Sequence, residues 1–183
     1  MALDRRTFLK TGVAGFGSLM LMPSCLKQVS PYRFFTLEEA NCIISMCEQI
    51  IPADEHGGGA TEAGVINYID RQLVAVFTYD QLIYQQGISA LQQSCLDLHG
   101  KRFEALDPGI QMEVLEKLEH SQLPEAYWEG AGQGAFFGRV VSHTMQGFYG
   151  SPRHGGNRNY MSYQMMGLDF PLVVGRNHYA HLS

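Results

Sequence analysis

Residues 147–160, GFYGSPRHGGNRNY, are rich in side chains that can bind another molecule. This stretch holds two arginines, two tyrosines, two asparagines and a histidine, spaced by four glycines and a proline. A guanidinium group can bind a carboxylate through two parallel hydrogen bonds, and tyrosine and arginine are enriched at the centres of protein interfaces. The pattern predicts recognition of a partner protein, and packing of the loop on its own domain is the competing interpretation.

The backbone of this stretch is expected to form a shaped loop and not a flexible linker. Glycine permits positive φ, proline stiffens a turn, and asparagine side chains satisfy nearby backbone groups. A second glycine-rich turn, residues 54–59, is expected to contribute to the same contact. The candidate docking residues are Tyr149, Pro152, Arg153, His154, Gly155, Gly156, Asn157, Arg158, Tyr160 and Tyr163.

None of the motifs in the chain favours catalysis or a bound cofactor. Residues 130–135 match the loose glycine pattern of a dinucleotide site, but no buried strand precedes them and no acidic residue follows at the required distance. The seven histidines form no HExxH pattern, so solvated surface histidines are expected in place of a metal site. Ser142-His143 lacks the turn of a nucleophile elbow. We therefore expect no catalytic, cofactor-binding or metal-ligating residue.

Helical periodicity predicts the elements that must position the loop. A capping box at residues 36–39 opens the first helix, whose apolar positions recur until Pro52. Further helices are expected from residue 61, over 79–98 with a glycine cap, from Asp107-Pro108, and over 135–148. The prediction is an all-α domain of about five helices over residues 36–183. Its docking loop, residues 148–171, leads into an irregular tail.

Residues 1–24 have the pattern of a twin-arginine export signal, an expectation that excludes them from the folded domain. The signal residues are Arg5, Arg6, Phe8, Leu9 and Lys10, followed by a mildly apolar, glycine-diluted run over 11–22. Twelve residues of helix reach only about 18 Å, which is short of the ~30 Å hydrocarbon core of a membrane. The expected location is the periplasm, after export in the folded state by the twin-arginine translocase.

Cys25 ends a sequence, MPSC, that resembles a degenerate lipobox. Cleavage before this cysteine and its lipidation would hold the protein on the membrane surface without a spanning helix. Simple cleavage nearby is the alternative, and the sequence favours neither. Residues 25–35 are expected to be a tether between the leader and the domain.

Composition argues against a nucleic-acid partner. The chain has 13 Lys and Arg against 18 Asp and Glu, a net charge of −5. Residues 1–24 hold three of the basic and one of the acidic residues, so the charge without them is −7. An acidic chain neutralises phosphates poorly, and nucleic-acid affinity depends on that neutralisation. Cys42, Cys47 and Cys95 do not suggest a disulfide framework, so buried thiols are expected.

Two stretches resemble the gluconate 2-dehydrogenase subunit 3 family, the small subunits of flavin-dependent, membrane-associated dehydrogenases. They are FTLEEANCIISMCEQIIPADEHGGGATEAGVINYIDRQL and HTMQGFYGSPRHGGNRNYMSYQMMGLDFP, and the resemblance covers residues 34–171. The signature is strongest at residues 51–54, 62–65 and 155–157. Two positions depart from the family pattern, since His154 stands where a tyrosine is expected and Tyr163 where a tryptophan is common.

The resemblance implies a division of labour between subunits. A large GMC-type subunit would carry FAD and oxidise a sugar acid, a sugar or a polyol, with haem c in an optional third subunit, a c-type cytochrome. The small subunit would support maturation of the flavoprotein and carry the export signal for both. The expected function is therefore that of a non-catalytic accessory subunit. The alternatives are a free-standing exported metal-dependent enzyme and a lipid-anchored helical binding module.

Overall fold

The computed structural model describes residues 30–55, 57–130 and 132–168. These residues confirm the expected all-α class, because their only strand-like pairing is a single bridge between Asp54 and Gly57. The α-helices are α2 (Leu37–Ile50), α3 (Val65–Leu73), α4 (Gln81–His99), α5 (Pro108–Glu119), α6 (Gln133–Tyr149) and α7 (Met161–Met165). Short 3₁₀ helices are η1 (Thr78–Asp80), η2 (Phe103–Ala105), η3 (Glu125–Tyr127), η4 (Pro152–His154) and η5 (Arg158–Tyr160).

Local sequence signals set the ends of the long helices. The Thr36 hydroxyl accepts a hydrogen bond from the Glu39 N–H, and the Glu39 carboxylate accepts one from the Thr36 N–H, so the expected capping box opens α2. Gly100 ends α4 in the left-handed conformation, as its sequence predicts. Helix α3 begins only at Val65, later than its spacing predicts, because Gly64 adopts a φ of 71° and interrupts the helix there.

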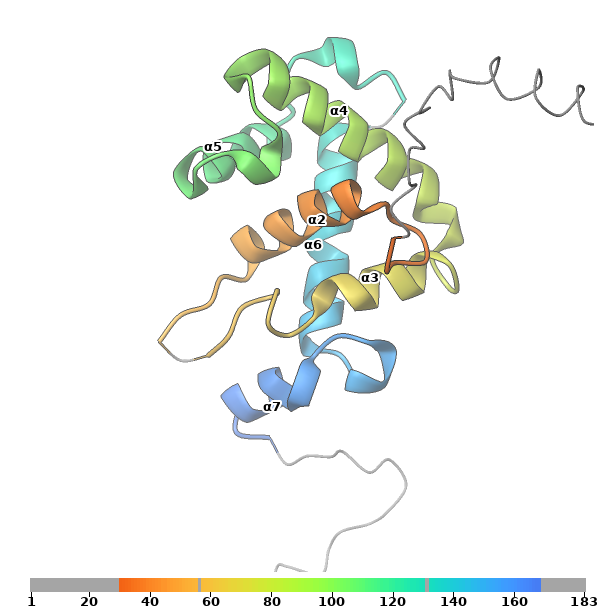
Figure 1. Ribbon diagram of the computed structural model, residues 1–183, viewed down its shortest axis with the longest axis vertical. Coiled ribbons are helices and arrows are strands. Elements are labelled where there is room, and N and C mark those ends of the chain that lie inside the picture. The colour runs from red at the N-terminus through yellow and green to blue at the C-terminus, as the bar shows by residue number, and fades with distance from the viewer. Residues whose placement is uncertain (1–29, 56, 131, 169–183) are drawn as a thin grey trace, which may run out of the picture.

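Helix α6 is the centre of the domain. It packs against α2, α3, α4 and α5, and Figure 1 shows it running through the middle of the molecule behind α2 and α3. Its inward face carries the buried side chains Phe136, Val140, His143 and Phe148. The C-terminal end of this same helix leads directly into the candidate docking loop, so the body of the domain fixes where that loop starts.

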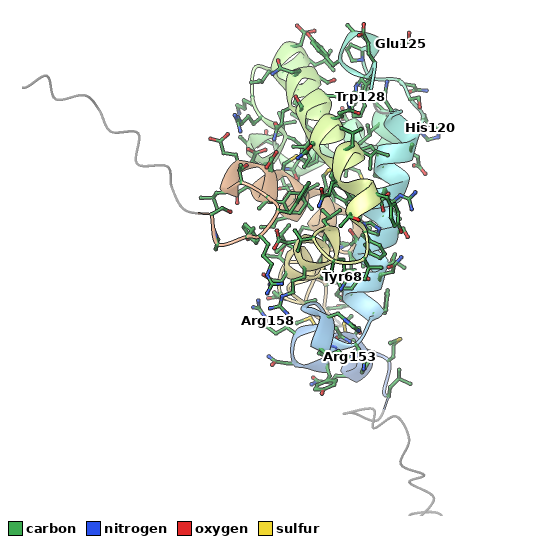
Figure 2. The ribbon with its side chains drawn as sticks, turned by 90° about the vertical axis from the view of Figure 1, so that its right-hand side faces the viewer. Tyr68, His120, Glu125, Trp128, Arg153 and Arg158 are labelled. Carbon is green, nitrogen blue, oxygen red and sulfur yellow. The ribbon has the colours of Figure 1, made fainter. Side chains whose placement is uncertain are left out.

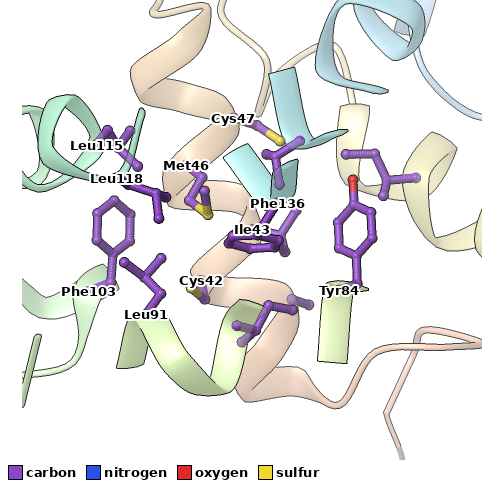
Figure 3. Close-up of a cluster of buried hydrophobic side chains, with 14 of the residues drawn as sticks. Cys42, Ile43, Met46, Cys47, Tyr84, Leu91, Phe103, Leu115, Leu118 and Phe136 are labelled. Carbon is purple, nitrogen blue, oxygen red and sulfur yellow. The ribbon is translucent and has the colours of Figure 1, made fainter. Parts of the chain in front are cut away.

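The hydrophobic core lies where α2 meets α4, α5 and α6 (Figure 3). Each large apolar side chain removed from water there contributes about 1.5–3 kcal/mol to folding. Residues of this core include Cys42, Ile43, Met46, Tyr84, Leu91, Phe103, Leu115, Leu118 and Phe136. Cys42, Cys47 and Cys95 are all buried as free thiols, and burial raises the pKa of Cys47 and of Cys95 to about 12.

Close packing between α4 and α6 depends on Gly87. A Cβ on this residue would overlap the ring of Phe136, which is fully buried. Gly87→Ala is therefore expected to lower the free energy of unfolding by about 2 kcal/mol, because the overlap outweighs the gain in helix propensity. Gly138, in α6, has no atom within 4 Å of the corresponding position, so Gly138→Ala should be stabilising by roughly 0.5–1 kcal/mol. Urea unfolding measures the free energy of unfolding of both variants. Equal changes in the two would contradict the proposed role of Gly87 in helix packing.

The described part of the expected tether, residues 30–35, packs on the domain. Phe35 is 1% exposed and belongs to the core. Asp70 of α3 accepts backbone hydrogen bonds from Arg33, Phe34 and Phe35, at 2.9–3.3 Å, although it is 37 to 35 residues away in the chain. A carboxylate that is 4% exposed thus fastens the start of the described chain to the middle of the fold.

The chain beyond α6 is more regular than its sequence predicts. It folds into η4, η5 and the short α7 within residues 151–168, where an irregular loop is expected. Short helices of this kind show too few turns for a hydrophobic period to reveal them. Within the described residues, no helix has the length and apolar character needed to cross a membrane.

Candidate docking surface

Asn157 holds the candidate docking loop in shape. Its side-chain amide donates to the Gly150 carbonyl at 2.8 Å, and its side-chain oxygen accepts from the Ser162 N–H at 2.9 Å. It is fully buried, with a φ of 44°, a left-handed conformation that asparagine tolerates better than most residues. One side chain therefore ties the end of α6 to the start of α7.

Two backbone contacts fix this loop to the rest of the domain. The Arg158 N–H donates to the Ala63 carbonyl at 2.9 Å, which joins η5 to the turn before α3. Gly156 lies against the carbonyl of Gly147 in α6, and a Cβ on Gly156 would overlap that oxygen. Glycine is needed at position 156 because the two backbones approach this closely.

The backbone of residues 155–160 is tightly wound. Gly155, Asn157, Asn159 and Tyr160 all have positive φ, between 44° and 108°. Tyr160 has a φ of 57°, which is uncommon for a bulky side chain and persists only where the surroundings hold it. Its ring contacts that of Tyr163 at 6.1 Å between centroids. The expectation of a shaped loop, in place of a flexible linker, agrees with this conformation.

The candidate docking residues divide into a buried and an exposed set. Gly156, Asn157 and Tyr163 are buried, so they shape the loop and present no surface to a partner. Pro152, Gly155 and Tyr160 are half-buried, whereas the side chains available to a partner are Tyr149, Arg153, His154 and Arg158. The predicted signal residues Arg5, Arg6, Phe8, Leu9 and Lys10, with the lipidation candidate Cys25, lie outside the described residues.

The glycine-rich turn, residues 54–59, lies against α7. Cβ atoms on Gly57 and Gly58 would lie 2.6 Å from the Met165 sulfur and 3.0 Å from the Met161 methyl carbon. Glu48 of α2 holds both sides of the turn, because its carboxylate accepts from the N–H groups of residues 53 and 61 at 3.1 and 2.9 Å. The two segments that the sequence nominates for docking thus meet in space.

Five of the exposed large apolar side chains belong to the last turns of α6, to α7 and to the residues just after it, which lie at one end of the ribbon in Figure 1. We call this region the α7 end. Its large apolar side chains are 42–47% exposed, and they are Met145, Tyr149, Met165, Met166 and Leu168. Methionine adapts its shape to a partner, and clustered exposed apolar groups mark interaction surfaces. Apart from Tyr149, these residues are absent from the sequence-predicted set.

Positive charge is concentrated in the part of the sequence that forms α6, α7 and the loop between them. Residues 130–168 contain three arginines and no aspartate or glutamate, in a chain whose net charge is −5. Figure 2 shows Arg153 and Arg158 toward the α7 end and Glu125 at the opposite end. A hollow at α5 is lined by three glutamates and one lysine, namely Glu113, Glu116, Glu119 and Lys117. Residues 130–168 are thus cationic as a stretch, whereas the turn over 54–59 that lies against α7 carries Asp54 and Glu55.

A buried polar network joins η1, α4 and α6, and no pattern in the sequence predicts it. His143 is 2% exposed, which corrects the expectation of a surface position for this histidine, whereas His120 and His154 are exposed as expected. Its ring stacks on Phe77 at 4.4 Å between centroids, and its Nδ1 lies 3.0 Å from the Tyr84 hydroxyl. Its Nε2 faces the buried Asp80 carboxylate at 3.5 Å, and Asp80 is also paired with Arg139 at 3.2 Å.

This network binds η1, α4 and α6 together and is closed to solvent at its centre. Burial is the main cause that lowers the pKa of His143 from 6.5 to about 4, with Asp80 opposing the shift and Arg139 adding to it. The lowered pKa favours the neutral ring at pH 7, and the tautomer with its proton on Nε2 leaves Nδ1 to accept from the Tyr84 hydroxyl. No cluster of three His, Cys, Asp or Glu residues in the described chain is placed to hold a metal ion.

We expect the neutral histidine to make the protein less stable in mild acid. Because the pKa of His143 is about 4 in the folded protein and 6.5 ordinarily, the unfolded chain binds the proton more tightly. The stabilising contribution is complete above pH 6.5 and is lost as the pH falls from 6.5 towards 4. Between about pH 7 and about pH 5, the free energy of unfolding should fall by about 2 kcal/mol through this group.

Urea unfolding of the wild type and of His143→Gln at these two pH values measures the effect. The glutamine does not titrate, while the remaining ionisable groups contribute to both proteins. The wild type should therefore lose about 2 kcal/mol more than the variant on acidification. Equal losses in the two proteins would show that His143 keeps an ordinary pKa.

Comparison with known proteins identifies one family. The chain matches the family described as gluconate 2-dehydrogenase subunit 3 over residues 37–169, from the first residue of α2 to just beyond the described part of the loop after α7. No curated protein and no solved structure matches the chain significantly. Because the match takes in both the helical body and the candidate docking loop, the chain belongs to the gluconate 2-dehydrogenase subunit 3 family, whose members are accessory subunits of a dehydrogenase.

Proposed function

We propose that this protein is the non-catalytic small subunit of a periplasmic, FAD-dependent dehydrogenase of a sugar, a sugar acid or a polyol. It docks with its α7 end on a GMC-type large subunit, which carries FAD and the substrate site. Membership of a family of dehydrogenase subunits supports this class of partner. A c-type cytochrome with haem c would be a third subunit in complexes that contain one.

The main support for the docking role is that the α7 end exposes apolar side chains on a rigidly held backbone. Its apolar side chains are 42–47% exposed, yet they stand on helix α6 and on a segment that is held by the buried Asn157 and by close backbone approaches to residues 63 and 147. A surface that is apolar and already shaped loses little conformational entropy when a partner covers it. That combination supports binding to a preformed complementary surface.

The polar groups of the domain support a role without turnover. The Asp80–His143–Tyr84 network is a set of ionisable groups in the core, and each of these residues is buried. A substrate cannot reach groups that are closed off in this way. The network instead rigidifies the junction of η1, α4 and α6.

Co-expression with a GMC-type flavoprotein tests the docking role, with FAD absorbance of the captured complex as the readout. The double variant Tyr149→Ser/Met165→Ser should weaken binding by about 10-fold or more, because each residue would be an interface anchor. The matched control is Tyr79→Ser/Leu82→Ser, which alters side chains that are 69% and 61% exposed near the start of α4. Two outcomes would show that the docking site lies elsewhere. They are loss of flavoprotein capture in the control variant alone, and unchanged capture after deletion of residues 148–163.

The proposed route to the periplasm is the twin-arginine translocase, with the leader serving both subunits. The support is the sequence pattern at Arg5, Arg6, Phe8, Leu9 and Lys10. Replacing Arg5 and Arg6 with lysine should keep both subunits in the cytoplasm, as cell fractionation would show. Mass spectrometry of the mature N-terminus decides whether Cys25 carries a lipid that anchors the complex to the membrane.

A further inference from the structure

Two arginines lie on or beside α3, and each packs closely against a glycine. A Cβ on Gly64 would lie 3.2 Å from Nη2 of Arg158, and a Cβ on Gly155 would lie 3.1 Å from Nη1 of Arg71. Gly64 has a φ of 71° and Gly155 a φ of 108°, conformations that favour glycine. The backbone is therefore shaped to receive both guanidinium groups.

Asn67 connects the two positions. Its side-chain Nδ2 would lie 3.2 Å from a Cβ on Gly64, beside the Arg158 guanidinium, and its carbonyl oxygen would lie 3.1 Å from a Cβ on Gly155, beside Arg71. Asn67 and Arg71 lie four residues apart on one side of α3, and Gly64 is the residue just before the helix. The two arginines and the amide thus form one row, which we call the arginine row.

No ion pair within the described residues neutralises the arginine row. Arg71 and Arg158 are exposed, and neither forms an ion pair with a carboxylate in the described part of the chain. The carboxylate next in sequence, Asp70, is buried and engaged by the N–H groups of residues 33–35. By contrast, Arg102 is paired with Glu38 at 2.7 Å. The positive charge of the row is therefore available to an external anion.

We propose that the arginine row is a carboxylate-binding site that receives acidic side chains of the partner subunit. The planar guanidinium fork suits bidentate carboxylate recognition, whereas a lysine offers only a point charge. Lysines are absent from this side, since those of the described residues are Lys101 and Lys117, and Lys117 lies in α5. Guanidinium groups seated on glycine backbones also lose little rotamer freedom on binding.

The row adjoins the proposed docking surface, because Arg158 belongs to η5 and Arg153 extends the positive charge toward the α7 end (Figure 2). Apolar side chains at α7 would supply buried contact area, and the arginine row would fix the orientation of the partner. The proposal rests on the proposed function for the identity of the partner, but not for the chemistry of the site.

Calorimetric titration of the flavoprotein with charge variants tests the site. Arg71→Glu and Arg158→Glu should each weaken binding by about 10-fold or more, since each places a carboxylate opposite a carboxylate. Arg158→Lys should weaken it by about 3-fold, because charge is kept but the bidentate geometry is lost. Lys117→Glu, which changes the net charge by the same amount as the Arg→Glu variants, should leave binding within about 2-fold. Unchanged binding in both Arg→Glu variants, or equal weakening in all three charge reversals, would overturn the site while leaving the docking function intact.

If the wild-type chain captures no flavoprotein, the proposed function fails and a hexaglutamate peptide decides the site separately. Shifts of arginine Nε–H resonances on titration, lost in Arg71→Glu and Arg158→Glu but kept in Lys117→Glu, would support a carboxylate site. The absence of such shifts would overturn it. Binding to phosphatidylglycerol vesicles that both Arg→Glu variants abolish, without any response to hexaglutamate, would assign the row to a lipid headgroup and overturn the proposal.

Discussion

Replacing Asp70 with alanine is expected to lower the free energy of unfolding by about 3–5 kcal/mol. The carboxylate accepts hydrogen bonds from three successive backbone N–H groups, those of Arg33, Phe34 and Phe35. Removing it leaves these donors without a partner beside a buried part of the domain. The segment cannot simply move into water, because Phe35 is 1% exposed and its release would give up about 1.5–3 kcal/mol of apolar burial.

Two matched variants separate this mechanism from a general loss of charge. Asp70→Asn keeps an oxygen where Oδ1 accepts from all three N–H groups, so it should cost about half as much as alanine. Asp97→Ala removes an exposed carboxylate from α4 and should change stability by less than about 0.5 kcal/mol. Urea unfolding gives the three values. A cost for Asp70→Ala no greater than that for Asp97→Ala would show that the N-terminal segment does not contribute to the fold.

The elements of the body were predictable because their signals are local. The capping box at Thr36 and Glu39, and the glycine that ends α4, act within one turn of helix. The all-α class follows from such signals together with apolar spacing. The start of α3 was placed too early, because spacing alone does not reveal that Gly64 takes a left-handed conformation.

The parts that escaped prediction depend on contacts between distant residues. Asp70 meets residues 33–35 only once α3 has folded against the start of the domain. His143 is buried because Phe77, Tyr84 and Asp80 surround it, and none of these is close to it in sequence. The residues next to His143 in the sequence do not reveal this environment. For that reason the sequence alone predicts a surface position.

The sequence nominates a place for the candidate site, but it does not reveal the structural role of each residue there. Composition points to residues 147–160, and the exposed Tyr149, Arg153 and Arg158 fit an interface there. Asn157 has a residue type common at binding surfaces, yet its burial makes it part of the framework. Arg71 lies outside the stretch altogether and joins it only because Gly155 folds back onto α3.

Asn157→Ala is expected to open the loop while leaving the body of the domain folded. The change removes both side-chain hydrogen bonds, to Gly150 and from Ser162, and forces alanine into a left-handed conformation. These losses together amount to about 3 kcal/mol, which corresponds to about 100-fold faster hydrogen exchange of the Ser162 amide. Helices α2 to α6 do not depend on Asn157, so the unfolding midpoint should move much less than the loss in the loop.

Asn157→Gly provides the control that divides the effect into its two causes. Glycine loses the same hydrogen bonds but adopts the φ of 44° without strain, so its loop should be about 1 kcal/mol more stable than that of the alanine variant. Both variants should bind the flavoprotein more weakly, because Arg158 and the α7 side chains are positioned by the bonds that Asn157 makes. Ser162 exchange at the wild-type rate in the alanine variant would mean that the loop is held by Gly156 and the Ala63 carbonyl alone, and Asn157 would then have no part in shaping the docking surface.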